Sequence, residues 1–265
     1  MSTLAYTVSD SATMLRRNLL HMRRYPSVTV FLVGMPVVFL LLFVYVFGGT
    51  LGAGLGGSGG RSAYLAYVVP GILLMAVAGG ATGTAISVAM DMTEGIIARF
   101  RTMAISRAAV LTGHVVGSVI QTMLGMAVVI GVALLIGFRP TAGPVAWLAV
   151  IGVLAMITFA ITWLSVALGL VTKSVESASN LPMPLMLLPF LGSGFVPTDS
   201  MPTGVRWFAA YQPFSPVIET LRGLLTGTEI GNSAILAVAW CAGITLVGYV
   251  WATKLYDRSS EFGVR

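Results

Sequence analysis

The segment Asp91-Met-Thr-Glu-Gly-Ile-Ile-Ala-Arg-Phe-Arg-Thr-Met-Ala-Ile-Ser-Arg107 is the most charged internal stretch of the chain, and a long apolar run lies on each side of it. Read as a helix, it has one apolar stripe, with Arg99 and Arg101 beside the stripe and Glu94 on the far face. Asp91, three residues before Glu94, is typical of a helix start. The pattern predicts a helix over 91–107 that lies flat on a membrane and presents its polar side to water. An ordinary interfacial loop helix has the same pattern.

The composition is that of an integral membrane protein. Hydrophobic residues make up 57% of the chain and charged residues only 9%, whereas a soluble domain carries about 25% charged residues. The net charge of +6 is spread over the loops and is not gathered on one face, so it indicates membrane topology and not nucleic-acid binding. The single cysteine, Cys241, lies in an apolar run, where a packed thiol is expected. Neither His21 nor His114 has a partner at metal-ligand spacing, and no metal site is predicted.

Six apolar runs are near or above the roughly 20 residues that cross a hydrocarbon core. The predicted spans are 28–47, 66–90, 110–138, 145–171, 178–196 and 233–253. Pro36 predicts a kink in the first span, and the fifth contains Pro182, Pro184 and Pro189, which exclude a straight helix. The glycine-rich stretch 48–60 predicts a flexible linker outside the bilayer.

All nine acidic residues fall outside these six spans. A carrier driven by protons or ions usually needs an acid inside the bilayer to bind and release the coupling ion. The distribution therefore argues against a secondary transporter.

The first 27 residues predict an amphipathic helix on the inner leaflet that ends near Pro26, with Arg16, Arg17, Arg23 and Arg24 as its basic residues. A signal peptide is the alternative, but the polar N-terminal segment and the apolar run that follows it are both longer than those of a signal peptide. The N-terminal segment, the 91–109 and 172–177 loops and the C-terminal segment hold eleven of the fifteen Lys and Arg residues. By the positive-inside rule both termini, and with them the 91–107 helix, are cytoplasmic.

The segment 197–231 lies outside by this count, yet it is half apolar and is broken by Pro213 and Pro216. It is too polar to span and too apolar for a free loop. We expect a re-entrant pair of short helices that dips back among the outer ends of the spans, in which Glu219 and Arg222 pair at i, i+3. An aromatic-rich interfacial loop is the alternative.

The sequence does not contain the complete motif of either an ATP-hydrolysing enzyme or an intramembrane serine protease. A phosphate-binding loop needs a glycine-rich run before its Lys-Ser, and Thr172 precedes Lys173-Ser174. If ATP drives this protein, a partner binds it. The serine in Gly192-Ser193-Gly194 resembles a protease nucleophile, but both histidines lie toward the opposite side of the membrane, too far to act as its base. Glycines that let kinked helices pack closely explain the same residues.

Polar side chains within the spans either bond to neighbouring backbone or line a path between helices. We expect backbone bonding for most of them, among which are Thr82, Thr84 and Thr122, and a path-lining role for Gln121. Methionines suit an adaptable apolar surface as well as a core. The pathway candidates are Gln121, Asn180, Met183 and Met186.

Over essentially its whole length the chain resembles the membrane subunits of ABC-2 type exporters, and among them the daunorubicin-resistance-type permeases of actinobacteria. The segment 94–107 resembles the family's E-x-G…R-[FL]-R-x-x-P-[IV]-x-R stretch and departs from it at Ala104, where proline is usual. The segment 195–227, with Phe195-Val-Pro, Met201-Pro and Gln212-Pro-Phe-Ser, resembles F-[VI]-P…M-P…N-P-[LF]-[ST]…R-x-x-x-x-G. It departs at Gln212, where asparagine is commoner.

The resemblance implies a non-catalytic half-transporter in the bacterial cell membrane that exports hydrophobic or amphiphilic molecules such as drugs, antibiotics or lipids. Two such chains, identical or similar, form the pathway, and two separate subunits bind Mg-ATP. A carrier of lipid-linked glycans or polysaccharide is the alternative within the class, and a membrane enzyme or scaffold is the alternative outside it. The resemblance implies a coupling helix with Glu94, Arg99, Phe100, Arg101 and Arg107, and a second contact through the N-terminal helix. It implies an outer gate made by Phe195, Pro197, Gln212, Pro213, Glu219 and Arg222.

Overall fold

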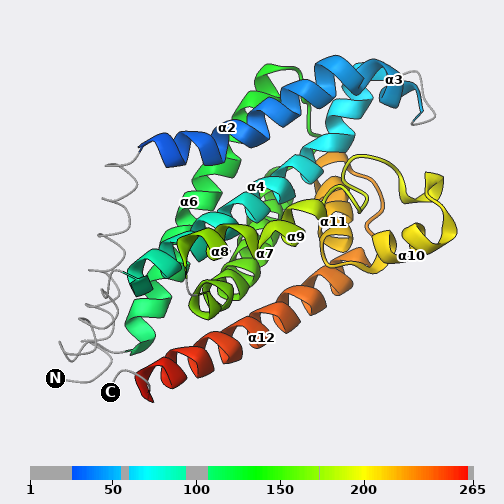
Figure 1. Ribbon diagram of the computed structural model, residues 1–265. Helices are drawn as coiled ribbons and strands as arrows, with labels where there is room; N and C mark the ends of the chain where they lie inside the picture. The colour runs from blue at the N-terminus through cyan, green and yellow to red at the C-terminus, as the bar shows by residue number, and fades with distance from the viewer. Residues whose placement is uncertain (1–25, 55–59, 94–106, 173, 262–265) are drawn as a thin grey trace.

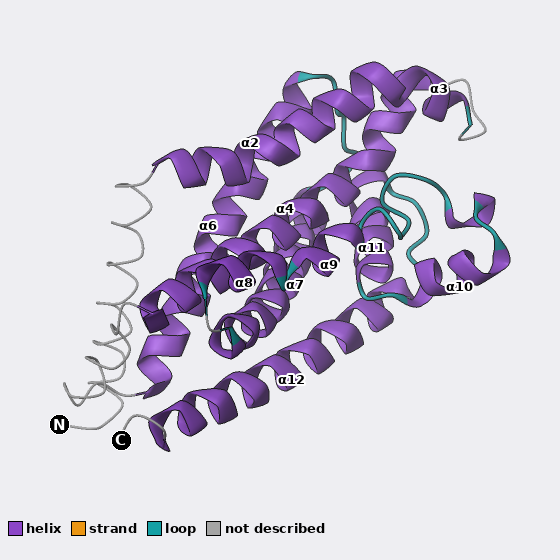
Figure 2. Cartoon of the chain, in the orientation of Figure 1, coloured by secondary structure: helices purple, strands orange, loops and turns teal. Residues whose placement is uncertain are grey.

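A computed structural model describes residues 26–54, 60–93, 107–172 and 174–261. Within these ranges the regular structure is helical (Figure 2). The long helices are α2 (Pro26–Leu42), α4 (Gly60–Thr93), α6 (Arg107–Leu135), α7 (Pro144–Val171) and α12 (Ser233–Glu261). The short ones are the π-helical turn η1 (Phe43–Phe47), α3 (Gly48–Ala53), α8 (Val175–Asn180), α9 (Met183–Leu187), the 3₁₀ turn η2 (Thr198–Ser200), α10 (Thr203–Tyr211) and α11 (Phe214–Thr226).

Five helical stretches are long and apolar enough to cross a membrane, and they fall on five of the six predicted spans. They are Leu32–Ala53, Gly60–Thr93, Leu111–Leu135, Pro144–Val171 and Ser233–Tyr256. The segment 178–196 is not among them, because it is divided between α8, α9 and a series of turns. Pro182 precedes α9 and Pro184 lies in its first turn, so the expectation that prolines exclude a straight helix here is confirmed. Pro36 lies inside α2, and its kink stays a prediction.

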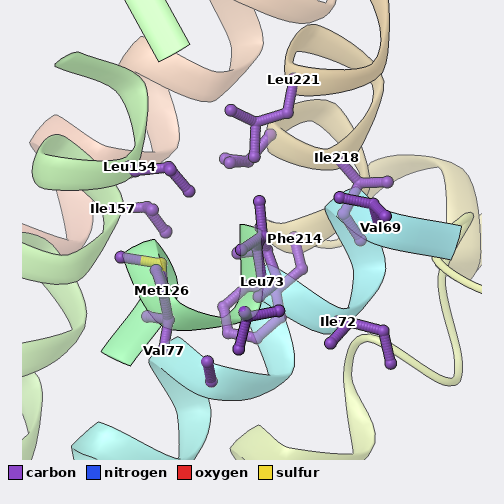
Figure 3. Close-up of a cluster of buried hydrophobic side chains, with 14 of the residues drawn as sticks. Val69, Ile72, Leu73, Val77, Met126, Leu154, Ile157, Phe214, Ile218 and Leu221 are labelled. Atoms are coloured by element: carbon purple, nitrogen blue, oxygen red, sulfur yellow. The ribbon is translucent and has the colours of Figure 1, made fainter. Parts of the chain in front are cut away.

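Helix α4 is the centre of the molecule (Figure 1). Of its most apolar window, 72% is buried, against 17% for α12, so α4 is surrounded by protein while α12 lies at the edge. The core forms where α4 meets α6, α7 and α11, with Leu73, Met126, Ile157 and Phe214 among its buried side chains (Figure 3). Lipid tails are as apolar as these side chains, so close packing and not exclusion of water stabilises such a core inside a bilayer.

The glycine-rich stretch 48–60 is not wholly a flexible linker, which corrects the prediction. Residues Gly48–Ala53 form α3, which continues the first long helix. A Cβ on Gly52 would collide with the backbone of Gly60, and one on Gly48 would press on the Arg61 side chain. Glycine is needed here because α3 and the start of α4 approach closely.

The C-terminal end of α4 differs from the prediction in where Asp91 lies. Asp91 does not begin a helix; it lies in the last turn of α4, which runs to Thr93. One acidic residue therefore lies within a helix that is apolar enough to span, contrary to the expectation that all nine fall outside the spans. The helix extends past the apolar run because Asp91 is buried against a partner on α6. The remainder of the predicted 91–107 helix up to residue 106, and the N-terminal helix, lie outside the described residues.

A close approach at Gly71 fixes α4 against the turn that follows α9. A Cβ on Gly71 would lie 2.6 Å from the carbonyl oxygen of Gly194 and 2.8 Å from its Cα, both of them backbone atoms that cannot rotate away. We expect Gly71→Ala to lower the free energy of unfolding by about 1–3 kcal/mol through overpacking, measured as a lower midpoint of thermal unfolding of the purified chain in detergent. Gly79→Ala on the same helix is the control, because its nearest neighbour is the Leu32 side chain at 3.7 Å. Equal midpoints for the two variants would contradict the close approach.

Candidate functional site

The turns between α9 and η2 leave backbone carbonyls without helical partners, and three of them accept hydrogen bonds from side chains of other elements. Gln212 Nε2 donates to the carbonyl of Leu188 at 3.1 Å. Arg222 Nη2 donates to that of Ser193 at 2.6 Å, and the Tyr64 hydroxyl donates to that of Phe195 at 3.3 Å. A buried carbonyl without a partner costs free energy, so α4, Gln212 and α11 together stabilise the break in the chain.

Arg222 lies at the middle of this arrangement and is only 9% exposed. Its Nη1 donates to Glu219 Oε1 at 2.8 Å, which confirms the predicted i, i+3 pair. Its Nη2 also donates to the Tyr67 carbonyl at 3.3 Å, and the guanidinium lies 3.8 Å over the Tyr67 ring. A buried cation is tolerated only when it is paired and hydrogen-bonded. Here the guanidinium joins α4, the Ser193 turn and α11.

Gln212 ends one helix and supports the next. It precedes Pro213, which disfavours helical geometry at Gln212 and ends α10 there. Its Oε1 accepts a hydrogen bond from the first N–H of α11, that of Phe214, at 3.2 Å. Its Nε2 donates to Ser215 Oγ at 3.0 Å as well as to the Leu188 carbonyl. Ser215 Oγ in turn accepts from the Ser193 N–H at 3.2 Å.

An aromatic cluster covers the same turn on the side of the first helix. The ring of Phe195 stacks on that of Phe190 with centroids 4.5 Å apart, and it lies 4.5 Å from the ring of Phe43. Phe195 is 4% exposed. Its side chain therefore packs inside the fold, between η1 and the broken segment.

The residues predicted for the outer gate thus separate into two groups. Phe195 lies in the turns around Ser193, and Gln212 and Arg222 donate hydrogen bonds to the backbone of these turns. Glu219 joins this group through its ion pair with Arg222. Pro197 and Pro213 are half-buried and precede η2 and α11, respectively. The expected pair of short helices is present as α10 and α11, and α11 packs one face into the core through Phe214, Val217, Ile218, Leu221 and Leu225. Tyr64 and Tyr67 were not predicted as site residues, because Tyr64 precedes the predicted span 66–90 and Tyr67 lies at its start, and no motif distinguishes either of them.

The four pathway candidates differ in their exposure. Asn180 and Met183 are exposed on the broken segment, whereas Met186 is half-buried and packs against the core. Gln121 is half-buried within α6. The expectation of backbone bonding is confirmed for Thr82 and Thr84, whose hydroxyls donate to the carbonyls of Ala78 and Gly80.

At the opposite end of α4 lies a buried polar pair that the sequence did not reveal. His114 Nε2 is 3.1 Å from Asp91 Oδ2, and the two side chains are 7% and 9% exposed. The residues are 23 positions apart, so no spacing rule for metal ligands or helix faces connects them. Of the predicted coupling residues, Arg107 begins α6, and Glu94, Arg99, Phe100 and Arg101 lie outside the described residues. So do Arg16, Arg17, Arg23 and Arg24.

Within the described residues, no base lies at hydrogen-bond distance from the Ser193 hydroxyl. Its hydroxyl is buried and has no hydrogen-bond partner among the described residues, whereas a nucleophilic serine needs a base within reach. His114 is engaged with Asp91 at the other end of α4. The glycines beside Ser193 are explained by packing, since a Cβ on Gly192 or Gly194 would meet atoms of neighbouring groups.

Comparisons with known proteins agree with this picture. The profile of the family described as "ABC-2 type transporter" matches residues 11–226. The daunorubicin resistance ABC transporter permease protein DrrB1 of Streptomyces coeruleorubidus is 30% identical over 97% of this chain and 89% of its own length. The probable doxorubicin resistance ABC transporter permease protein DrrC of Mycobacterium tuberculosis is 27% identical over 85% of this chain and 80% of its own length.

Loss of the Arg222 guanidinium tests whether this site stabilises the fold. We expect Arg222→Met to lower the free energy of unfolding by about 2–4 kcal/mol, because two backbone carbonyls and Glu219 lose a buried donor. The measurement is thermal unfolding of the purified chain in detergent. Arg206→Met is the matched control, since Arg206 pairs with Asp199 at the surface and such pairs contribute under about 1 kcal/mol. A similar loss in both variants would contradict the assigned role.

Proposed function

The chain belongs to the ABC-2 type transporter family, and from this premise we propose that it is the membrane-spanning permease subunit of an ATP-driven exporter of hydrophobic or amphiphilic molecules. Its relatives are named as ABC transporter permease proteins for resistance to daunorubicin and doxorubicin. The observation that carries the proposal is the match to such a permease over 97% of the chain. The substrate class is a drug, an antibiotic or a lipid.

We propose that the energy comes from separate subunits, two copies of which bind Mg-ATP. The sequence has no phosphate-binding loop of its own. Helix α4 ends and helix α6 begins at the end of the molecule where α12 also ends (Figure 1), and the segment 94–106 connects α4 to α6 in the sequence. Its Glu94, Arg99, Phe100 and Arg101, with Arg107, contact the ATP-binding subunit, and the N-terminal arginines make a second contact.

The topology that we propose has six crossings, with both termini in the cytoplasm. Five crossings are continuous helical stretches. The sixth is the broken segment from α8 to η2, which runs from the end of α7 toward the end that holds α10 and α11 (Figure 1). That end is extracellular, and α10 and α11 form a re-entrant segment. The Arg222 contacts hold this segment in place as part of an outer gate.

The broken crossing also supports a proposal for the location of the pathway. Irregular backbone at membrane depth is tolerated only against protein or along a water-filled cavity, and not against lipid. Yet this segment exposes Leu181, Met183, Leu187 and Leu191. We propose that a second permease chain, identical or similar, faces this surface across a shared pathway, with Asn180 and Met183 among the lining residues.

The role of the 91–107 segment is tested in the complex with the ATP-binding subunit. We expect Glu94→Ala or Arg101→Ala to reduce daunorubicin transported per ATP hydrolysed by about fivefold or more, a typical size for coupling between sites. The measurement is ATP-dependent uptake by inverted membrane vesicles together with phosphate release. Glu229→Ala, in the loop before α12, is the control and should behave as wild type. Wild-type coupling in both inner variants would remove the role assigned to this segment.

The pathway is tested with cysteines placed at two equally exposed apolar positions. Met183 is 60% exposed on the broken segment, and Leu246 is 65% exposed on α12. In the assembled complex, with Cys241 replaced by alanine, we expect a water-soluble thiol reagent to label Met183→Cys at least about tenfold faster than Leu246→Cys, because a thiolate forms in water and not in hydrocarbon. Equal rates would show that both positions face the same medium and would contradict the proposed pathway.

A further inference from the structure

The Asp91–His114 pair lies at a particular place in the chain. Asp91 occupies the last turn of α4, and His114 lies two turns into α6. The two helices are consecutive, and residues 94–106 connect them. The pair therefore bridges the two helix ends at the base of the segment to which the coupling function is assigned.

The surroundings make this pair a rigid point of contact. Beside it lies an inner cluster of buried apolar side chains from α4, α6, α7 and α12. Its members are Val88, Leu111, Val115, Trp163, Val166, Ala167, Ala252 and Tyr256. With both side chains more than nine-tenths buried, the imidazole of His114 has no free access to water as a replacement partner. Separation of the two groups would leave this buried imidazole without the carboxylate that it contacts, which costs free energy.

Helix α4 connects this inner pair to the Arg222 site. From Asp91 back to Tyr67 the helix is continuous, and 24 residues at 1.5 Å per residue correspond to about 36 Å. Tyr67 carries the ring and the carbonyl that contact Arg222. A displacement at the inner end of α4 therefore reaches the outer site through a single helix. For α6 to move with α4, their inner ends must be joined.

We propose that Asp91 and His114 are positioning residues that clamp the ends of α4 and α6, so that a displacement of segment 94–106 moves both helices as one unit. This inference rests on the proposed function, because it assumes that an ATP-binding subunit displaces the segment. The pair does not contact substrate or nucleotide. Its effect is on the yield of transport for each ATP hydrolysed.

The test compares two substitutions of similar size at one position. His114→Gln retains a side-chain N–H that reaches the Asp91 carboxylate, and His114→Leu fills a similar volume without any donor. In the complex with its ATP-binding subunit, assayed in inverted membrane vesicles with daunorubicin as probe, we expect His114→Leu to lower transport per ATP by about fivefold or more. We expect His114→Gln to remain within about twofold of wild type.

Two further variants separate coupling from simple stability. Thr162→Val removes an equally buried hydroxyl on α7, which donates to the Thr158 carbonyl, and it should leave the ratio unchanged. The exchange of partners, Asp91→His with His114→Asp, restores the pair in the opposite order and should recover the ratio lost in His114→Leu. If His114→Leu fails to assemble, the exchange decides: recovery of assembly and ratio supports the clamp, and absence of recovery overturns it.

The outcomes distinguish this inference from the proposal beneath it. A wild-type complex without ATP-dependent movement of daunorubicin, or a chain recovered without an ATP-binding subunit, refutes the proposed function. A wild-type complex that transports normally, with His114→Leu equally coupled, refutes only the clamp. A ratio lowered to the same extent in His114→Gln and His114→Leu also refutes it, because the hydrogen bond to Asp91 then makes no difference.

Discussion

The structure depends on hydrogen bonds to backbone carbonyls that have no helical partner, because the helix is broken at that place in the chain. Prolines interrupt the segment between α8 and η2, and the carbonyls of Leu188, Ser193 and Phe195 accept hydrogen bonds from Gln212, Arg222 and Tyr64. None of these donors is local, because the sequence separations range from 24 to 131 residues. The break therefore requires α4 and α11 to be in place. Conversely, the hydrogen bonds that Arg222 donates to backbone carbonyls stabilise α11 in the core, although an arginine is costly to bury.

Sequence pattern predicts the parts of this fold that follow from hydrophobicity and chain length. Five spans, the broken character of the predicted fifth span, the pair of short helices and the Glu219–Arg222 contact all follow from apolar runs, proline positions or i, i+3 spacing. The parts of the fold that sequence pattern predicts wrongly depend on contacts between residues that are distant in the sequence or belong to different helices. In α3, Gly52 lies so close to the backbone of Gly60 that a Cβ would not fit, whereas composition alone favours a flexible linker. The last turn of α4 continues past the apolar run because Asp91 finds His114, 23 residues away.

Sequence patterns predict less of the candidate site than of the fold. Tyr64 and Tyr67 contribute a hydroxyl, a carbonyl and a ring face to the site, yet in sequence they are two aromatic residues in an apolar run. The glycines around Ser193 were the available signal, since they indicate close approach of backbone. Asp91 lies within a helix that is apolar enough to span, so the distribution of acidic residues does not exclude an ion-driven carrier. Membership in the ABC-2 type transporter family is the observation that opposes one.

Helix α4 connects the Arg222 site near one end of the molecule to the Asp91–His114 pair near the other. It is the most buried of the five candidate spans, and it carries a polar contact near each end, Tyr67 with Arg222 and Asp91 with His114. Buried polar contacts are directional and cannot slide, whereas apolar contacts between helices permit small shifts. A helix fixed in this way at both ends transmits displacement along its axis and resists independent rotation at either end. Pro70 lies within α4 only three residues from Tyr67, and since a proline removes one backbone hydrogen bond from a helix, any bending of α4 is expected to concentrate next to the Arg222 site and away from the inner pair.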